Sequence, residues 1–240
     1  MTGKLVAAKE LAAKRKGRFS SESAAYAKAR EALLAEEIEV RRHLGRLAQQ
    51  NRELPEGPEL APGGDDWKFV GPNGGEVGLA DMFGSHDTLV LYHWMFGPER
   101  NRPCPMCTNL LGPLAANAAD LQQRVALAVV ARSKVERMTA FGIERGWRDL
   151  PYYQAVGDEF SIAIGGLEPE KRMEMPVLMV LRKRNGTVRL HWMGEMTMEM
   201  ADPGEDPRGA VDLAPLWNIL DLTPAGRDPN WYPRLSYDPR

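Results

Sequence analysis

Hydrophobic and polar residues follow different patterns along the chain, and the changes of pattern divide it. Residues 1–20 are basic without a repeating apolar pattern, which predicts a loose arm. Residues 21–52 repeat apolar positions at helical spacing, which predicts one amphipathic helix. Residues 53–66 are rich in Pro, Gly and acidic side chains, which is typical of a linker before a domain at 67–240. The apolar stripe of the helix consists of Tyr26, Leu33, Val40, Leu44 and Leu47.

Short apolar runs dominate the first half of the predicted domain. Residues 67–70 and 76–79 flank a Gly-rich turn, which predicts a hairpin, and a short turn of helix follows at 79–83. Residues 88–95 are almost continuously apolar, as expected of a strand that is buried on both faces. A helix is predicted over 105–123, with a kink at Gly112-Pro113.

The order of the next elements predicts the class of the fold. Residues 125–130 form a second apolar strand. Ser133 and Glu136 have the spacing of a capping box, which predicts a helix that runs to Arg145. Strand, helix, strand and helix in succession favour parallel pairing and an α/β sheet.

The C-terminal part predicts a hairpin and one more helix. Residues 175–182 and 187–193 read as strands, and Asn185-Gly186 between them is a strong turn signal. A polar loop is expected at 201–209 and a final helix at 211–221.

Composition and charge exclude several classes of function. The 240 residues carry a net charge of −2, so no general basic field suggests nucleic acid as a partner. No apolar run approaches the roughly 20 residues of a membrane span. The basic N-terminus lacks the apolar segment of a secretory signal, and cysteine is scarce. We therefore expect a cytoplasmic protein, whose thiols stay mostly reduced.

The two cysteines of the chain, Cys104 and Cys107, are separated by Pro105 and Met106. This spacing suits a helix start with the first sulfur exposed, where the helix dipole and free N–H groups stabilise a thiolate. Pro105 fits the first helical position, since its missing N–H is not needed there. A redox dithiol and half of a metal site are both consistent with the pair.

Several local sequences carry a resemblance to a known family. The dithiol follows a buried strand, and Met175-Pro176 opens another apolar strand. Together with the segments 29–34, 53–55, 91–98, 146–147 and 221–227, these residues resemble a bacterial thioredoxin-like family of unknown function (DUF899). Its members are described as predicted dithiol-disulfide oxidoreductases or isomerases. The methionine-rich and acidic stretch 191–209 departs from the family pattern.

The resemblance implies a thioredoxin-like three-layer α/β/α sandwich with an N-terminal helical extension. Cys104 would be the nucleophile and Cys107 the resolving thiol, acting on a disulfide-containing protein or a small thiol substrate without a cofactor or metal. A cis-proline at Pro176 would face the dithiol, and Met175 would offer backbone groups to an extended substrate. Pro105 and Met106 complete this predicted groove.

Other nearby side chains are open to two interpretations. Arg100 and Arg102 either lower the pKa of the Cys104 thiol or are solvated loop charges. His93 is either a satisfied core residue or a shuttle for the Cys107 proton, and the first interpretation is favoured. Tyr92 and Trp94 read as packing residues.

Three further alternatives remain at the level of the sequence. His191 and the methionines at 193, 196, 198 and 200 favour core or groove lining over a Cu(I) site, and one cysteine pair is too few ligands for closed zinc. A thiol peroxidase of this fold would have Thr or Ser where Asn101 lies. A non-catalytic redox sensor or metal clip is the alternative from another class. The amphipathic helix also suggests a homodimer through residues 21–50.

Overall fold

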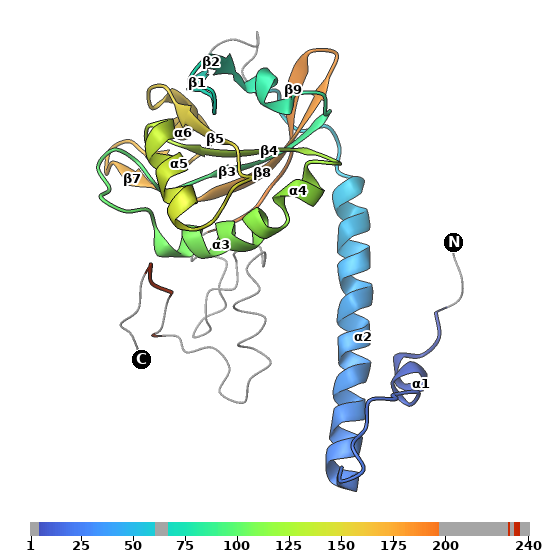
Figure 1. Cartoon of the computed structure of the whole chain (residues 1–240). Coiled ribbons are helices and arrows are strands. Elements are labelled where there is room, and N and C mark those ends of the chain that lie inside the picture. The colour runs from blue at the N-terminus through green and yellow to red at the C-terminus, as the bar shows by residue number, and fades with distance from the viewer. Residues whose placement is uncertain (1–4, 61–66, 197–229, 231–232, 236–240) are drawn as a thin grey trace. The chain divides into compact units, whose positions relative to one another are not determined.

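A computed structural model describes residues 5–60, 67–196, 230 and 233–235 (Figure 1). The chain forms two compact units, Met1–Pro55 and Glu56–Arg240. The loop predicted at 201–209 and the helix predicted at 211–221 lie outside the described residues, as do Met198 and Met200.

The N-terminal unit contains two helices, α1 (Ala8–Ala12) and α2 (Ala24–Arg52). Helix α2 begins where the Ser23 hydroxyl accepts a hydrogen bond from the Tyr26 N–H at 3.2 Å. Residues 8–12, predicted as part of a loose arm, instead pack on α2. Small side chains make this possible, because Ala12 is fully buried and meets Ala35 where larger residues would hold the helices apart.

The second unit is built on a seven-stranded sheet in the order β2-β1-β5-β4-β3-β8-β9. Strand β3 pairs parallel with β4 and antiparallel with β8, and β4 pairs parallel with β5. Two short strands, β6 and β7, pair separately. The strands are β1 (Lys68–Val70), β2 (Glu76–Gly78), β3 (Thr88–His93), β4 (Ala126–Ala131), β5 (Tyr152–Ala155), β6 (Leu167–Glu168), β7 (Met173–Glu174), β8 (Val177–Arg184) and β9 (Thr187–Met193).

Helices cover both faces of this sheet (Figure 1). Apolar residues of α3, α4 and α5 form one core with Tyr92 and Trp94, while η1 and α6 form the other with Leu89 and Leu91. The predicted thioredoxin-like α/β/α sandwich is therefore confirmed. The helices are η1 (Leu79–Phe83, a 3₁₀ helix), α3 (Pro105–Ala116), α4 (Ala118–Leu121), α5 (Val135–Glu144) and α6 (Glu159–Ala163).

Two helix boundaries differ from the prediction. The helix after the dithiol is interrupted at Asn117 rather than at Gly112-Pro113, because the Asn117 side chain donates to the Pro113 carbonyl at 2.8 Å and competes with the helical pattern. The predicted capping box is also wrong. Lys134 precedes α5, and the Ser133 hydroxyl accepts from Arg137 at 3.2 Å instead of capping the helix.

Both predicted hairpins are confirmed, and the second has an added segment. Asn185 and Gly186 adopt φ values of 51° and 81°, the left-handed conformations that a tight hairpin turn needs. Residues 57–60, predicted as linker, pair with β9: Leu60 donates to the Val188 carbonyl at 2.9 Å and Leu190 donates to Pro58 at 3.0 Å. This pairing covers an edge strand that would otherwise present unpaired backbone groups.

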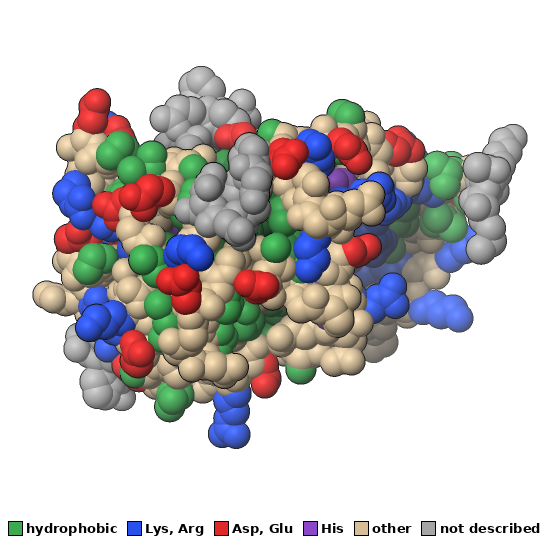
Figure 2. Space-filling view, turned by 90° about the horizontal axis from the view of Figure 1, so that it is seen from above, with side chains coloured by type: hydrophobic (Ala, Val, Ile, Leu, Met, Phe, Trp, Pro, Cys, Tyr) green, Lys and Arg blue, Asp and Glu red, His purple; other side chains and the backbone are tan. Residues whose placement is uncertain are grey.

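The surface carries a mixture of charges. On the face that Figure 2 shows, acidic and basic side chains both occur among hydrophobic ones, in keeping with the net charge of −2. Within the described ranges, no helix is long and apolar enough to cross a membrane.

Candidate active site: the dithiol at the start of α3

The dithiol lies where the chain leaves β3 and enters α3. Cys104 is the N-cap residue of α3, and Pro105 occupies its first turn, as predicted. The Cys104 N–H donates to the Met95 carbonyl at 3.1 Å, and its carbonyl accepts from the N–H and the hydroxyl of Thr108. Cys104 is half-buried, Cys107 is only 2% exposed, and both are free thiols. The first sulfur is therefore reachable and the second lies behind it.

The two thiols have opposite acidities. A hydrogen bond from the Cys107 thiol lowers the pKa of Cys104 to about 6; burial opposes this, while the N–H groups of Cys107 and Met106 and the Arg100 charge assist it. The same hydrogen bond, together with burial and the Cys104 charge, raises the pKa of Cys107 well above its ordinary value. At neutral pH Cys104 is thus mostly thiolate and Cys107 remains a thiol.

Tyr92, expected only to pack, belongs to this site. Its hydroxyl is hydrogen-bonded to the Cys107 side chain, and its pKa is raised by burial and then by the two cysteines. The hydrogen bond works in the opposite direction on Cys107, whose pKa it lowers. Strand alternation contains the signal that would have found Tyr92, since residues 92 and 93 must face opposite sides of the sheet.

His93 lies on the side of β3 away from the dithiol. Its Nδ1 is 3.1 Å from the Met175 carbonyl oxygen, and its Nε2 is 3.0 Å from the Ser161 hydroxyl. Complete burial lowers its pKa to about 4; the Met175 hydrogen bond opposes this shift and the Arg132 charge adds to it. The interpretation of His93 as a proton shuttle for Cys107 is therefore wrong, and the core interpretation is correct.

The backbone at Met175 and Pro176 differs from the prediction. The bond between them is trans, since no peptide bond among the described residues is cis. The Met175 N–H donates to the Gly166 carbonyl at 3.0 Å, and its carbonyl lies against His93. Both backbone groups that an extended substrate would need are used inside the fold, so the predicted strand-addition edge at Met175 is not free.

The two upstream arginines have different surroundings. Arg102 forms a two-pronged ion pair with the exposed Glu144, with one N–O distance of 2.9 Å, and its guanidinium lies 4.9 Å from the Phe141 ring centre. Glu144 raises the pKa of Arg102, and its carboxylate pairs with the Arg102 charge. Arg100 instead lowers the pKa of Cys104. Of the two predicted tuning residues, the structure supports Arg100.

Residues 17–238 match one family model, which is described as a bacterial protein of unknown function (DUF899). The chain belongs to this family. The predicted resemblance is thereby confirmed. No curated protein matches this DUF899 chain.

Several solved structures are similar to the DUF899 chain. The thiol peroxidase from Chromobacterium violaceum is 14% identical, with a TM-score of 0.45, over 70% of this chain and 87% of that one. A cysteine-to-serine mutant of PrxQ from Xylella fastidiosa is 14% identical, with a TM-score of 0.42, over 58% and 84%. The exposed lipoprotein thioredoxin Etrx1 from Streptococcus pneumoniae strain TIGR4 is 14% identical, with a TM-score of 0.39, over 55% and 89%.

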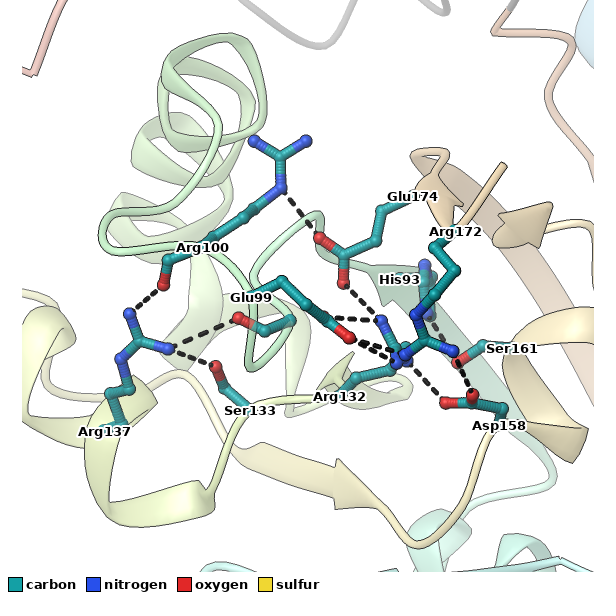
Figure 3. Close-up of polar contacts among 11 residues, drawn as sticks. His93, Glu99, Arg100, Arg132, Ser133, Arg137, Asp158, Ser161, Arg172 and Glu174 are labelled. Atoms are coloured by element: carbon teal, nitrogen blue, oxygen red, sulfur yellow. Dashed lines mark hydrogen bonds and ion pairs between the residues drawn. The ribbon is translucent and has the colours of Figure 1, made fainter. Parts of the chain in front are cut away.

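A network of charged residues holds the loop between β3 and the dithiol of the DUF899 protein (Figure 3). Arg132, whose side chain is 4% exposed, donates to Asp158 at 2.7 Å and to Glu99 at 3.2 Å, and lies 3.7 Å from Glu174. Glu174, equally buried, accepts from Arg100 Nε at 2.8 Å. The sequence did not indicate this network, because its members are up to 75 positions apart.

Arg137 and Gly97 complete the support of this loop. Arg137 donates to the Arg100 carbonyl (Figure 3). It also donates to the carbonyls of Gly97 and Asn101, and its guanidinium lies 4.4 Å from the Phe96 ring centre. A Cβ atom at Gly97 would lie 2.3 Å from Glu174 Oε1, so only glycine allows the loop to approach the buried carboxylate. The backbone that leads to Cys104 is therefore fixed by side chains from α5 and β7.

The remaining predicted site residues are placed as follows. Pro105 and Met106 are exposed next to Cys104. Met193 is exposed at the end of β9, and Met196 packs against the core of Trp94. In the part of the chain that the structure describes, no group of three or more His, Cys, Asp or Glu side chains could hold a metal ion.

Proposed function

We propose that this DUF899 protein is a thiol–disulfide oxidoreductase, with Cys104 as nucleophile and Cys107 as resolving thiol. The observation that carries the proposal is the asymmetry of the pair. A reachable thiolate with a pKa near 6 lies at a helix N-terminus, in front of a buried thiol with a raised pKa. This is the arrangement that attack and resolution require. The reducing cytoplasm suits an enzyme that rests as the dithiol.

The reaction begins at Cys104. Its thiolate sulfur attacks one sulfur of the substrate disulfide, the substrate S–S bond breaks, and the leaving thiolate takes a proton from solvent. Attack removes the negative charge from Cys104, and this charge is one of the causes that raised the pKa of Cys107. Cys107 therefore becomes more acidic once the mixed disulfide has formed.

Resolution completes the exchange. Cys107 releases its proton to solvent and its sulfur attacks the Cys104 sulfur, which breaks the mixed disulfide. The second substrate sulfur leaves as a thiolate and takes up a proton from solvent. The substrate has then gained two electrons and two protons, and the protein holds a Cys104–Cys107 disulfide. A thiol reductant returns it to the dithiol. Run in reverse, the same steps oxidise a substrate dithiol.

The experiment that tests the function is a redox titration in glutathione buffers, read by alkylation and intact mass. We expect one two-electron transition between the dithiol and the Cys104–Cys107 disulfide, together with catalytic reduction of a model disulfide. A pair that stays reduced in oxidised buffer would contradict the proposal. Consumption of hydrogen peroxide without disulfide reduction would favour the peroxidase alternative, and a stoichiometric metal would favour the non-catalytic one.

Replacing Tyr92 tests its role in resolution. Tyr92→Phe removes a hydrogen bond that lowers the pKa of Cys107, so we expect the mixed disulfide to decay roughly tenfold more slowly. Attack by Cys104 should change little. Single-turnover mass spectrometry separates the two steps, with Tyr153→Phe, on β5, as the control. Equal slowing of both steps would show that Tyr92 acts only through packing.

A further inference from the structure

Arg100 is held in place by one nitrogen and leaves the others available. Its Nε donates to Glu174 Oε2 at 2.8 Å, and its carbonyl accepts from Arg137. Glu174 is 4% exposed, whereas the Arg100 side chain is 36% exposed. Among the described residues, neither Nη group of Arg100 has a hydrogen bond or ion pair, and Figure 3 shows both directed away from Glu174.

The other arginines near the dithiol loop are committed. Arg102 is paired with Glu144, and Arg172 is paired with Glu99 and Asp158. Arg132 and Arg137 have their donors occupied by the carboxylates and carbonyls of the network. Among the described arginines around this loop, Arg100 is therefore the one whose guanidinium has donors available for an anion that approaches Cys104.

We propose that Arg100 binds an anionic group, a carboxylate or similar oxyanion, of a small disulfide whose sulfur Cys104 attacks. The two Nη groups present parallel N–H bonds, the geometry that matches a carboxylate. A small disulfide suits the site better than an extended peptide, since the backbone groups of Met175 are occupied. This inference deepens the proposed function and rests on it.

The test compares disulfides of different charge. Mixed-disulfide formation is measured in the Cys107→Ser background with glutathione disulfide (anionic), hydroxyethyl disulfide (neutral) and cystamine (cationic). Arg100→Gln should slow the reaction with glutathione disulfide about fivefold more than that with the neutral disulfide, and should favour cystamine. The ratio between substrates cancels any change in the Cys104 pKa, which acts on all three. Arg102→Gln is the matched control, because it removes the same charge from an arginine whose donors are already occupied by Glu144.

The outcomes separate this inference from the proposed function. An equal effect of Arg100→Gln on all three disulfides would overturn the substrate class and leave the enzyme function standing. Absence of turnover by the intact dithiol would overturn the function. The ratio of the rates of mixed-disulfide formation with the charged and the neutral disulfides would still decide the role of Arg100, because that step needs only the Cys104 thiolate.

A second, independent inference comes from α2. Its stripe of Tyr26, Leu33, Val40, Leu44 and Leu47 is more than half exposed, and α1 packs on the opposite side of the helix. Four of the five recur every seven residues, the spacing of a left-handed coiled coil. Residues 24–38 have one more acidic than basic side chain, whereas residues 39–52 carry four arginines against one glutamate.

We infer that the stripe pairs with the same stripe of a second copy in antiparallel orientation, which places the acidic half against the basic half. Sedimentation analysis of the full chain should give a dimer that weakens as ionic strength rises. Val40→Glu should give a monomer, while Ala32→Glu, off the stripe, should remain dimeric. A monomeric wild-type chain at micromolar concentration would overturn this inference.

Discussion

Cys104→Ser abolishes disulfide reduction, whereas Cys107→Ser keeps the attack and accumulates the mixed disulfide. The first result follows because Cys104 is the reachable thiolate, with its pKa lowered to about 6, whereas a serine hydroxyl is not ionised at neutral pH. The second follows because resolution needs the buried Cys107 sulfur. We expect a loss of at least about 1000-fold for Cys104→Ser, as for removal of an essential nucleophile. Turnover and intact mass with a model disulfide measure both.

The pH profile gives this prediction a second readout. The alkylation rate of Cys104 should rise through pH 6 and level off above pH 7, because a thiol with a pKa of about 6 is almost entirely thiolate there. Cys107 should stay unreactive over the same range, since its pKa is raised. Two equally reactive thiols with an inflection above pH 8 would contradict the assigned roles. Retained reductase activity in Cys104→Ser would do the same.

Arg132→Gln lowers the free energy of unfolding by about 1–3 kcal/mol, because one oxygen of a buried carboxylate loses its cation while the other keeps Arg100. The carboxylate is that of Glu174, which is 4% exposed and whose Oε1 lies 3.7 Å from Arg132. Arg172→Gln is the matched control and should cost less than about 1 kcal/mol, because Arg172 joins the same network from the surface, 54% exposed. Urea unfolding at pH 7 measures both variants.

A double variant shows whether the charge itself is the cause. Arg132→Met combined with Glu174→Met removes both buried charges, so it should be more stable than Arg132→Gln. It should also release Arg100, and thereby raise the pKa of Cys104 in the alkylation assay. If Arg132→Gln and Arg172→Gln lower the free energy of unfolding equally, the buried residues of the network contribute no more to stability than its exposed residues.

Local pattern determined the elements that position the dithiol. The apolar run before the cysteines predicted β3, and the Cys-Pro-Met-Cys spacing predicted the start of α3, because helix starts depend on residues within one turn. Asn185-Gly186 predicted the hairpin, since two consecutive left-handed residues are needed there. The family resemblance then carried the order of these elements to the thioredoxin-like sandwich.

The tertiary structure alone decided which side chains meet. Tyr92 and His93 are neighbours in sequence, yet one reaches Cys107 and the other faces Ser161, because α3 covers only one side of β3. Arg100 and Arg102 are not distinguished by the sequence pattern. In the structure, Arg100 pairs with the buried Glu174 and keeps available donors, whereas Arg102 pairs with the exposed Glu144. The contacts of His93, Arg100 and Arg102 join residues 42 to 74 positions apart, and local pattern contains no information about such separations. The sequence by itself thus determined where the thiols are, and folding determined what surrounds them.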